Sequence, residues 1–169
     1  MLHIYCGDGK GKTTAAFGLA SRAAGRGRRV VIAQFLKGED SGERRSMEYV
    51  PHVLLLPLPR QMKFVFQMNP VERAECESDS HKLLWDAVAL AEQTSLLVLD
   101  EVLGALETGI LLEEDLLQAL SELPGECEVV LTGRNPSQAI LDRADYITEM
   151  TLRRHPYEQG VPAREGIEY

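Results

Sequence analysis

Short apolar runs rich in β-branched residues alternate along the chain with longer segments of helical periodicity. The apolar runs predict strands at residues 2–6, 30–35, 53–56, 96–100, 129–132 and 146–150. The helical segments between them are residues 13–25, 70–92, 113–123 and 137–143. Strands and helices that take turns favour an α/β fold, with a mostly parallel central sheet and helices on both of its faces.

The carboxyl ends of parallel strands are the usual place for a ligand, so the residues after each strand carry the candidate chemistry. The first strand leads into a glycine-rich turn that ends in Gly11-Lys12-Thr13, and an alanine-rich helical segment follows. This order is typical of a phosphate-binding loop, in which backbone N–H groups surround the phosphates, Lys12 adds positive charge and the Thr13 hydroxyl ligates magnesium. The residues expected to bind the phosphates are Gly7, Asp8, Gly9, Lys10, Gly11, Lys12, Thr13 and Thr14.

The loop departs from the G-x-x-x-x-G-K-[ST] pattern at one position. Cys6 stands where the first glycine of that pattern would fall. The alternative is a glycine turn that binds nothing, and the apolar strand before the loop and the helix after it argue against this alternative. We therefore expect a fold of the P-loop NTPase-like type that binds a nucleotide through an altered loop.

A second signal lies where four apolar residues at 96–99 run directly into Asp100 and Glu101. A carboxylate at the end of a buried strand can hold magnesium beside a phosphate loop, while the triphosphate supplies other oxygen ligands. The alternative is that Asp100 only caps the helix that follows. The predicted magnesium ligands are Thr13, Asp100 and Glu101, and the sequence does not decide between the two acids.

Composition limits the classes of protein that fit. The 169 residues suggest one domain, residues 1–169, and the formal net charge of −8 argues against a nucleic-acid partner. The three cysteines have neither zinc-site nor disulfide-framework spacing, which favours a reducing cytoplasm. No apolar run is long enough to cross a bilayer, and no signal region precedes the first strand, so we expect a cytoplasmic protein without a membrane partner.

The sequence offers no nucleophile of its own. There is no G-x-S-x-G elbow and no Cys/His pair that can be assigned as nucleophile and base. Two reaction classes remain: phosphoryl transfer or hydrolysis with water or a substrate hydroxyl, and a transfer in which the second substrate brings its own nucleophile. Arg134, directly after a predicted strand, could pair bidentately with phosphate, although a surface role fits an arginine in such a turn equally well.

Several motifs, taken together, closely resemble those of the P-loop type of ATP:cob(I)alamin (corrinoid) adenosyltransferases. These motifs lie at residues 7–16, 34–38, 99–101, 132–135, 148–150, 155–157 and 166–169. The resemblance spans essentially the whole chain, and the loop that lacks its first glycine is itself a mark of that family.

The resemblance implies a reaction at carbon. A corrinoid cobalt is reduced to cobalt(I), which attacks the ribose 5′-carbon of ATP and expels triphosphate, as in the biosynthesis or salvage of adenosylcobalamin. Lys12, Thr13 and Glu101 would be catalytic because they stabilise the departing triphosphate together with magnesium. The family also implies a homodimer and a flavoprotein reductase as electron donor. A generic P-loop kinase or ATPase and a non-catalytic carrier of nucleotide and corrinoid are the alternatives.

The resemblance further assigns residues to each substrate. Lys63-Phe64-Val65-Phe66 matches a family segment, usually Gly-Phe-Thr-Trp, whose two aromatic rings lie against the corrin and ease the reduction of cobalt. Phe64 and Phe66 would therefore bind the corrinoid, whereas alternating aromatics are otherwise typical of one buried face of a strand. Arg22 and Arg134 would lie near ATP, although the position of Arg22 is also typical of an arginine on the surface of a helix. Many relatives also have an N-terminal extension over the active site, so we expect closure here from elsewhere, such as residues 160–169.

Overall fold

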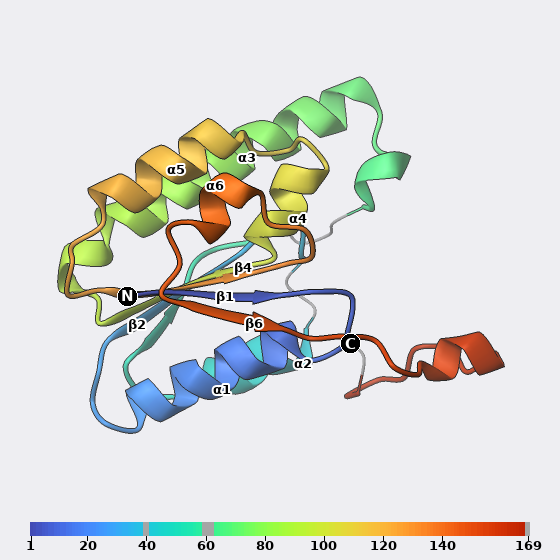
Figure 1. Ribbon diagram of the computed structural model, residues 1–169, viewed down its shortest axis with the longest axis horizontal. Helices are drawn as coiled ribbons and strands as arrows, with labels where there is room; N and C mark the ends of the chain where they lie inside the picture. Colours follow the sequence, from blue (N-terminus) through green and yellow to red (C-terminus); the bar gives the residue numbers. More distant parts are fainter. Residues whose placement is uncertain (39–40, 59–62, 168–169) are drawn as a thin grey trace.

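The central sheet contains six strands, and all of their pairings are parallel. The computed structural model describes residues 1–38, 41–58 and 63–167. The strands are β1 (Leu2–Cys6), β2 (Val30–Gln34), β3 (Val53–Leu55), β4 (Leu96–Asp100), β5 (Glu128–Thr132) and β6 (Tyr146–Glu149). They lie in the order β3-β2-β4-β5-β1-β6 (Figure 1). The predicted α/β fold with a parallel sheet is confirmed, and β1 and β4 have the predicted bounds.

Helices cover both faces of this sheet, as predicted. They are α1 (Lys12–Ala24), α2 (Gly42–Met47), α3 (Pro70–Ala89), α4 (Val102–Glu107), α5 (Glu113–Glu122) and α6 (Gln138–Leu141). Figure 1 shows α1 and α2 below the sheet and the other four helices above it. Short 3-10 turns lie at η1 (Val65–Gln67), η2 (Ala91–Gln93) and η3 (Pro156–Gln159). Within the described ranges, no helix is both long and apolar enough to span a membrane.

The alternation of side chains along the strands divides the core into two layers. In β2, Val30 and Ile32 pack in the layer that contains Phe17 of α1, whereas Val31 and Ala33 pack in the layer that contains Leu84 of α3. All five residues of β2 are buried. A central parallel strand is covered on both faces, so an uninterrupted apolar run is stable there.

The helix α3 is shorter than the predicted segment 70–92. Its start follows from a capping box, because Asn69 Oδ1 accepts hydrogen bonds from the N–H groups of Val71 and Glu72, and Glu72 accepts one from the Asn69 N–H. Its end lies at Leu90, after which the chain forms η2 as a separate turn. This boundary carries neither glycine nor proline, so no stop signal in the sequence marks it.

Candidate functional site

The phosphate loop lies between β1 and α1, and its glycines let it approach the end of β6. A Cβ atom on Gly7 or Gly9 would lie 2.5 or 2.6 Å from the Met150 carbonyl oxygen. The Gly9 N–H donates to that same oxygen over 2.6 Å. Gly7 and Gly11 also have φ angles of 99° and 117°, which favour glycine. The loop is therefore held against β6 by contacts that a side chain would prevent.

Two polar loop residues point toward the chain that follows β6. Asp8 Oδ1 accepts a hydrogen bond of 2.9 Å from the Leu152 N–H, and Lys10 Nζ donates to the Ile167 carbonyl oxygen over 2.8 Å. The tail thus reaches the phosphate loop. Residues 168 and 169, which belong to a motif of the resemblance and to the expected closing tail, lie outside the described residues.

Lys12 folds back over the phosphate loop. Its Nζ donates to the carbonyl oxygens of Gly7 at 2.7 Å and Gly9 at 2.8 Å. Burial lowers the pKa of Lys12, an effect that the nearby Glu101 carboxylate partly offsets. Thr14 follows in the first turn of α1 and is exposed. The ammonium group therefore lies inside the glycine-rich loop, against its carbonyl oxygens.

Asp100 is the centre of a buried polar cluster at the carboxyl ends of the strands. Its Oδ1 accepts from Thr13 Oγ1 at 2.9 Å and from Thr132 Oγ1 at 2.7 Å. Its Oδ2 accepts from Gln34 Nε2 at 3.1 Å and from Lys37 Nζ at 3.0 Å. The alternative that Asp100 caps a helix is wrong, because these four donors occupy its carboxylate and the N-cap of α4 is Glu101.

Glu101 is the N-cap residue directly before α4 and has a left-handed conformation with φ 59°. Its N–H donates to Thr132 Oγ1 over 2.8 Å, and its carboxylate lies over Gly104, where a Cβ atom would come within 2.5 Å of Oε1. No side chain in the described ranges donates a hydrogen bond to this carboxylate. Burial and, secondly, the charge of Asp100 raise the pKa of Glu101. Glu101 is thus a half-buried acid with its oxygens available.

Lys37 and Gln34 join this cluster from the end of β2. Lys37 Nζ lies 3.4 Å from Thr13 Oγ1, 3.3 Å from Glu43 Oε1 and 3.0 Å from Asp100 Oδ2. Burial lowers the pKa of Lys37, but the attraction to Asp100 and Glu43 outweighs burial and raises the pKa overall. Both lie in the motif at residues 34–38, at a strand end that could face the site, but neither was assigned a role from the sequence. The sequence feature that could have identified them is the presence of polar residues at the carboxyl end of an apolar strand.

The two arginines expected near ATP lie in different places. The Arg134 carbonyl oxygen accepts from the Gly7 N–H over 3.2 Å, and its charge lowers the pKa of Lys12, after the larger effects of burial and Glu101. Arg22 lies in the last turn of α1 and is exposed, ten residues after Lys12, which corresponds to about 15 Å along a helix. The structure thus brings Arg134 to the loop and leaves Arg22 away from it.

The aromatic pair is on the surface. Phe64 and Phe66 are 71% and 83% exposed, and their rings stack with centroids 5.5 Å apart and an angle of 15°. Val65 between them packs against the core. The alternative that these rings form the buried face of a strand is wrong, because the segment is a 3-10 turn. Apolar rings held in this way present an open platform to a ligand.

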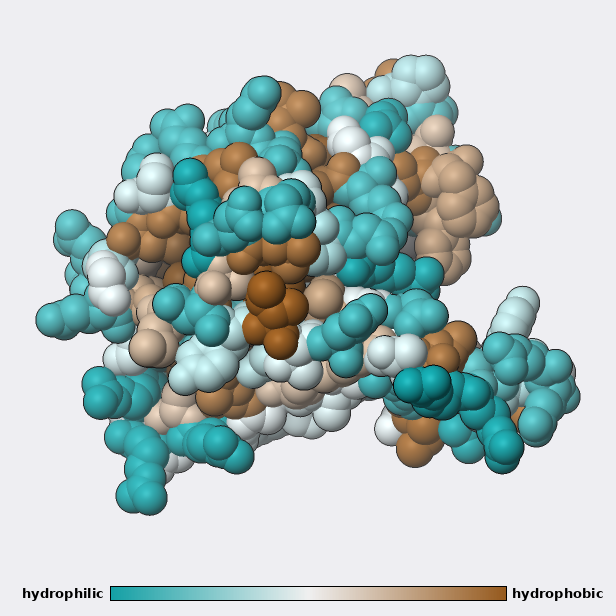
Figure 2. Space-filling model, in the orientation of Figure 1, coloured by the Kyte–Doolittle hydropathy of each residue, from teal (hydrophilic) through white to brown (hydrophobic). Residues whose placement is uncertain are grey.

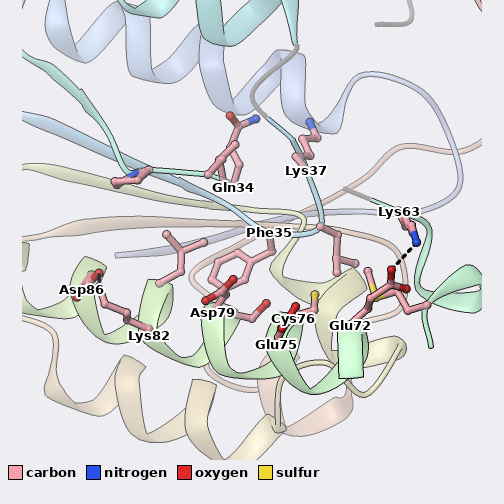
Figure 3. Close-up of a pocket in the computed structure, with 16 residues that line it drawn as sticks. Gln34, Phe35, Lys37, Lys63, Glu72, Glu75, Cys76, Asp79, Lys82 and Asp86 are labelled. Atoms are coloured by element: carbon pink, nitrogen blue, oxygen red, sulfur yellow. Dashed lines mark hydrogen bonds and ion pairs between the residues drawn. The ribbon is translucent and has the colours of Figure 1, made fainter. Parts of the chain in front are cut away.

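A cavity of about 610 Å³ lies between α3 and the end of β2 (Figure 3). Its lining includes Gln34 and Lys37 of the Asp100 cluster and also Lys63 and Met68, which flank the aromatic turn. Its volume lies within the range of small-molecule sites, about 300–1,000 Å³. The cavity therefore connects the polar cluster to the aromatic pair.

The oxygen donors of the cluster fit magnesium. Thr13 Oγ1 donates its hydrogen to Asp100, so a lone pair of this hydroxyl is available to a cation. Glu101 adds a carboxylate, and magnesium in nucleotide sites is bound by one or two such groups together with phosphate oxygens and water. Within residues 1–38, 41–58 and 63–167, no three His, Cys, Asp or Glu side chains form a metal site by themselves.

Comparison with known proteins shows which family the chain belongs to. The family described as ATP:corrinoid adenosyltransferase BtuR/CobO/CobP matches residues 1–169. Corrinoid adenosyltransferase CobA of Salmonella typhimurium is 35% identical over 171 residues, which cover 98% of this chain and 84% of the relative. Corrinoid adenosyltransferases of Escherichia coli and Pseudomonas aeruginosa are 36% and 32% identical, over 98% and 100% of this chain and 84% and 83% of those proteins. The chain therefore belongs to the ATP:corrinoid adenosyltransferase family and is a corrinoid adenosyltransferase.

Proposed function

We propose that the phosphate loop holds MgATP with its ribose 5′-carbon directed toward a corrinoid bound in the cavity beside α3. One observation carries this proposal: Gln34 and Lys37 donate hydrogen bonds to Asp100 in the cluster next to the phosphate loop and also line the cavity. Two substrates bound on either side of these residues would be neighbours. Bringing two reactants together in the correct orientation can lower a bimolecular barrier by about 7–11 kcal/mol.

In the proposed reaction, the electron pair of cobalt(I) forms a bond to the 5′-carbon of ATP. The bond between this carbon and the triphosphate oxygen breaks, and the electron pair leaves on inorganic triphosphate. The protein need not supply a nucleophile, since the corrinoid brings one. The protein contribution is electrostatic, because Lys12 and the loop N–H groups face the charge that develops on the leaving group.

Thr13 and Glu101 are the proposed magnesium ligands. Asp100 already accepts four hydrogen bonds, whereas the Glu101 carboxylate accepts none from the described side chains. Asp100 would therefore orient the Thr13 hydroxyl without binding the ion directly. Magnesium, when bound, supplies positive charge to the departing triphosphate.

Product analysis tests the proposal directly. The protein is incubated with MgATP and chemically reduced cobalamin without oxygen, and the products are separated. We expect adenosylcobalamin and triphosphate in equal amounts. Formation of ADP and phosphate would instead support the kinase or ATPase alternative, and corrinoid binding without turnover would support the carrier alternative.

Phe64 and Phe66 are proposed to contact the corrin face. Their exposure supports this role, because large exposed rings that cover no core are available to a ligand. We further propose that a flavoprotein reductase supplies the electron that converts cobalt(II) to cobalt(I). Coupled assays with and without such a donor, starting from cob(II)alamin, test this partner.

The chain is also proposed to act as one domain and as a homodimer in the cytoplasm. All four residues of β6 are exposed at the edge of the sheet, and an uncovered edge strand offers unpaired backbone groups to another chain. Figure 2 shows hydrophobic side chains over β6, whose exposed apolar residues are Tyr146 and Ile147. Sedimentation equilibrium measures the oligomeric state.

The free cysteines Cys6, Cys76 and Cys127 support a reducing compartment.

A further inference from the structure

The cavity beside α3 combines an apolar floor with a charged wall. Phe35, Leu58 and Leu83 are among its apolar lining residues. Most of the charged side chains that line it come from α3 (Figure 3). A corrin macrocycle has methyl groups and longer polar side chains around its edge. A half-open cavity of about 610 Å³ would take one edge of this ring rather than the whole of it. The charged wall would then meet the polar side chains of the corrin.

Every lysine that lines the cavity is already paired. Lys63 forms an ion pair with Glu72, and Lys82 forms one with Asp86, four residues further along α3. Lys37 is held by the fully buried Asp100. A carboxylate on a ligand would therefore have to compete with a protein carboxylate for each of these cations.

Two acidic residues that line the cavity, in contrast to these lysines, have no side-chain partner within the described residues. Glu75 and Asp79 lie one helical turn apart on α3 and both line the cavity. Neither forms an ion pair or a hydrogen bond with any side chain in the described part of the protein. A carboxylate accepts hydrogen bonds and repels other carboxylates, so these two residues favour neutral N–H donors in the cavity.

We propose that Glu75 and Asp79 make this cavity selective for corrinoids whose peripheral side chains are amides rather than carboxylates. The proposal rests on the proposed function, since it assumes that the cavity receives the corrinoid. Each amide nitrogen donates hydrogen bonds that the two carboxylates accept. A corrinoid that retains carboxylates brings a second negative charge to the same wall and is disfavoured.

Equilibrium binding without ATP tests the selectivity apart from catalysis. The probes are cobinamide, in which the acid side chains are amidated, and cobyrinic acid a,c-diamide, which keeps several carboxylates, both in the cobalt(II) state. We expect the unmodified protein to bind cobinamide at least about tenfold more tightly, and the ratio to fall as salt screens the charges. The double variant Glu75→Gln, Asp79→Asn should lose most of this ratio, mainly through tighter binding of the diamide.

Glu77→Gln is the matched control, because Glu77 lies on the same helix, is paired with Arg73 and does not line the cavity. It should leave the ratio unchanged, and circular dichroism verifies the fold of each variant. Equal binding of the two probes by the unmodified protein, or an unchanged ratio in the double variant, would overturn the selectivity alone. Absence of adenosyl transfer from MgATP to either probe after its chemical reduction to cobalt(I) would overturn the proposed function instead, so the two failures are distinguishable.

Discussion

The Lys37 ammonium forms an ion pair with Asp100, in which Nζ lies 3.0 Å from Oδ2, and it also lies close to Thr13. The same nitrogen lies 3.4 Å from Thr13 Oγ1. A lysine therefore contacts two of the three groups that the sequence predicted as magnesium ligands. Two cations cannot share such a small space without strong repulsion. Magnesium at Thr13 therefore either displaces the Lys37 side chain or binds more weakly because of it.

We therefore expect Lys37→Gln to change two affinities in opposite directions. Magnesium should bind the nucleotide-free protein more tightly, by about tenfold or more, because a repulsion of several kcal/mol at about 4 Å in a partly buried site is removed. MgATP should bind more weakly, since a cation beside the triphosphate is lost. Manganese binding followed by electron paramagnetic resonance measures the first affinity, and calorimetry measures the second.

Lys82→Gln is the control for the Lys37 variant. Lys82 also lines the cavity, but its ammonium pairs with Asp86 on the surface of α3. Its loss should change neither affinity. A Lys37 variant whose metal affinity stays constant, or falls together with its MgATP affinity, would show that Lys37 does not compete with the metal.

Glu101→Gln should stabilise the nucleotide-free protein and abolish adenosyl transfer. Burial raises the pKa of Glu101, so the folded protein holds this proton more strongly than the unfolded chain does. Ionisation of Glu101 therefore lowers the free energy of unfolding as the pH rises from the ordinary glutamate pKa to the raised value. At neutral pH, glutamine removes this cost, and a gain of about 1 kcal/mol would raise the melting temperature by about 2–4 °C.

Scanning calorimetry at several pH values checks this effect. The difference in melting temperature between Glu101→Gln and the unmodified protein should be largest near neutral pH and vanish in acid, where Glu101 is protonated. Glu114→Gln, at an exposed position of α5, should show no such dependence. A Glu101 variant that is less stable at neutral pH would mean that the carboxylate has a stabilising partner.

Gly9→Ala tests the contact between the phosphate loop and β6. The added methyl group would lie 2.6 Å from the Met150 carbonyl oxygen, so the loop must shift and lose the hydrogen bond between them. A displacement of about 1 Å at a reacting group can cost about 100-fold in rate, and we expect a loss of that order in kcat/KM. Gly18→Ala in α1 meets nothing within 4 Å and should instead stabilise the protein by about 0.5–1 kcal/mol. Full activity of the Gly9 variant would contradict this account of the loop.

The parts of the site that the sequence predicted are those that depend on neighbours along the chain. The strand, the glycine turn and the helix around Lys12 follow one another along the chain, so the local sequence pattern was enough to predict them. Asp100 was predicted because a run of buried apolar residues ends there. The helices α2 and α4 were missed, since six residues do not establish a helical period.

The role of Lys37 could not be predicted in the same way. It depends on the pairing of β2 with β4, which places Gln34 beside Asp100 although 66 residues separate them. Local periodicity carries no information on the order of strands in a sheet. The contacts of Asp8 and Lys10 with the tail are equally long-range, and they direct two predicted phosphate ligands toward backbone groups.

The exposed aromatic pair leads to a prediction that separates reduction from transfer. Replacing Phe64 and Phe66 by alanine should slow turnover that starts from cob(II)alamin about tenfold more than turnover that starts from cob(I)alamin, a difference of about 1.4 kcal/mol in barrier. The reason is that, in the proposed role, the two rings on the corrin face ease the reduction of cobalt, and chemical reduction beforehand makes this help unnecessary. Because both rings are exposed, the melting temperature should hardly change. Tyr49→Ala removes another largely exposed ring, in the turn after α2, and should affect neither rate. Equal losses from both starting states would mean that the pair only positions the corrinoid.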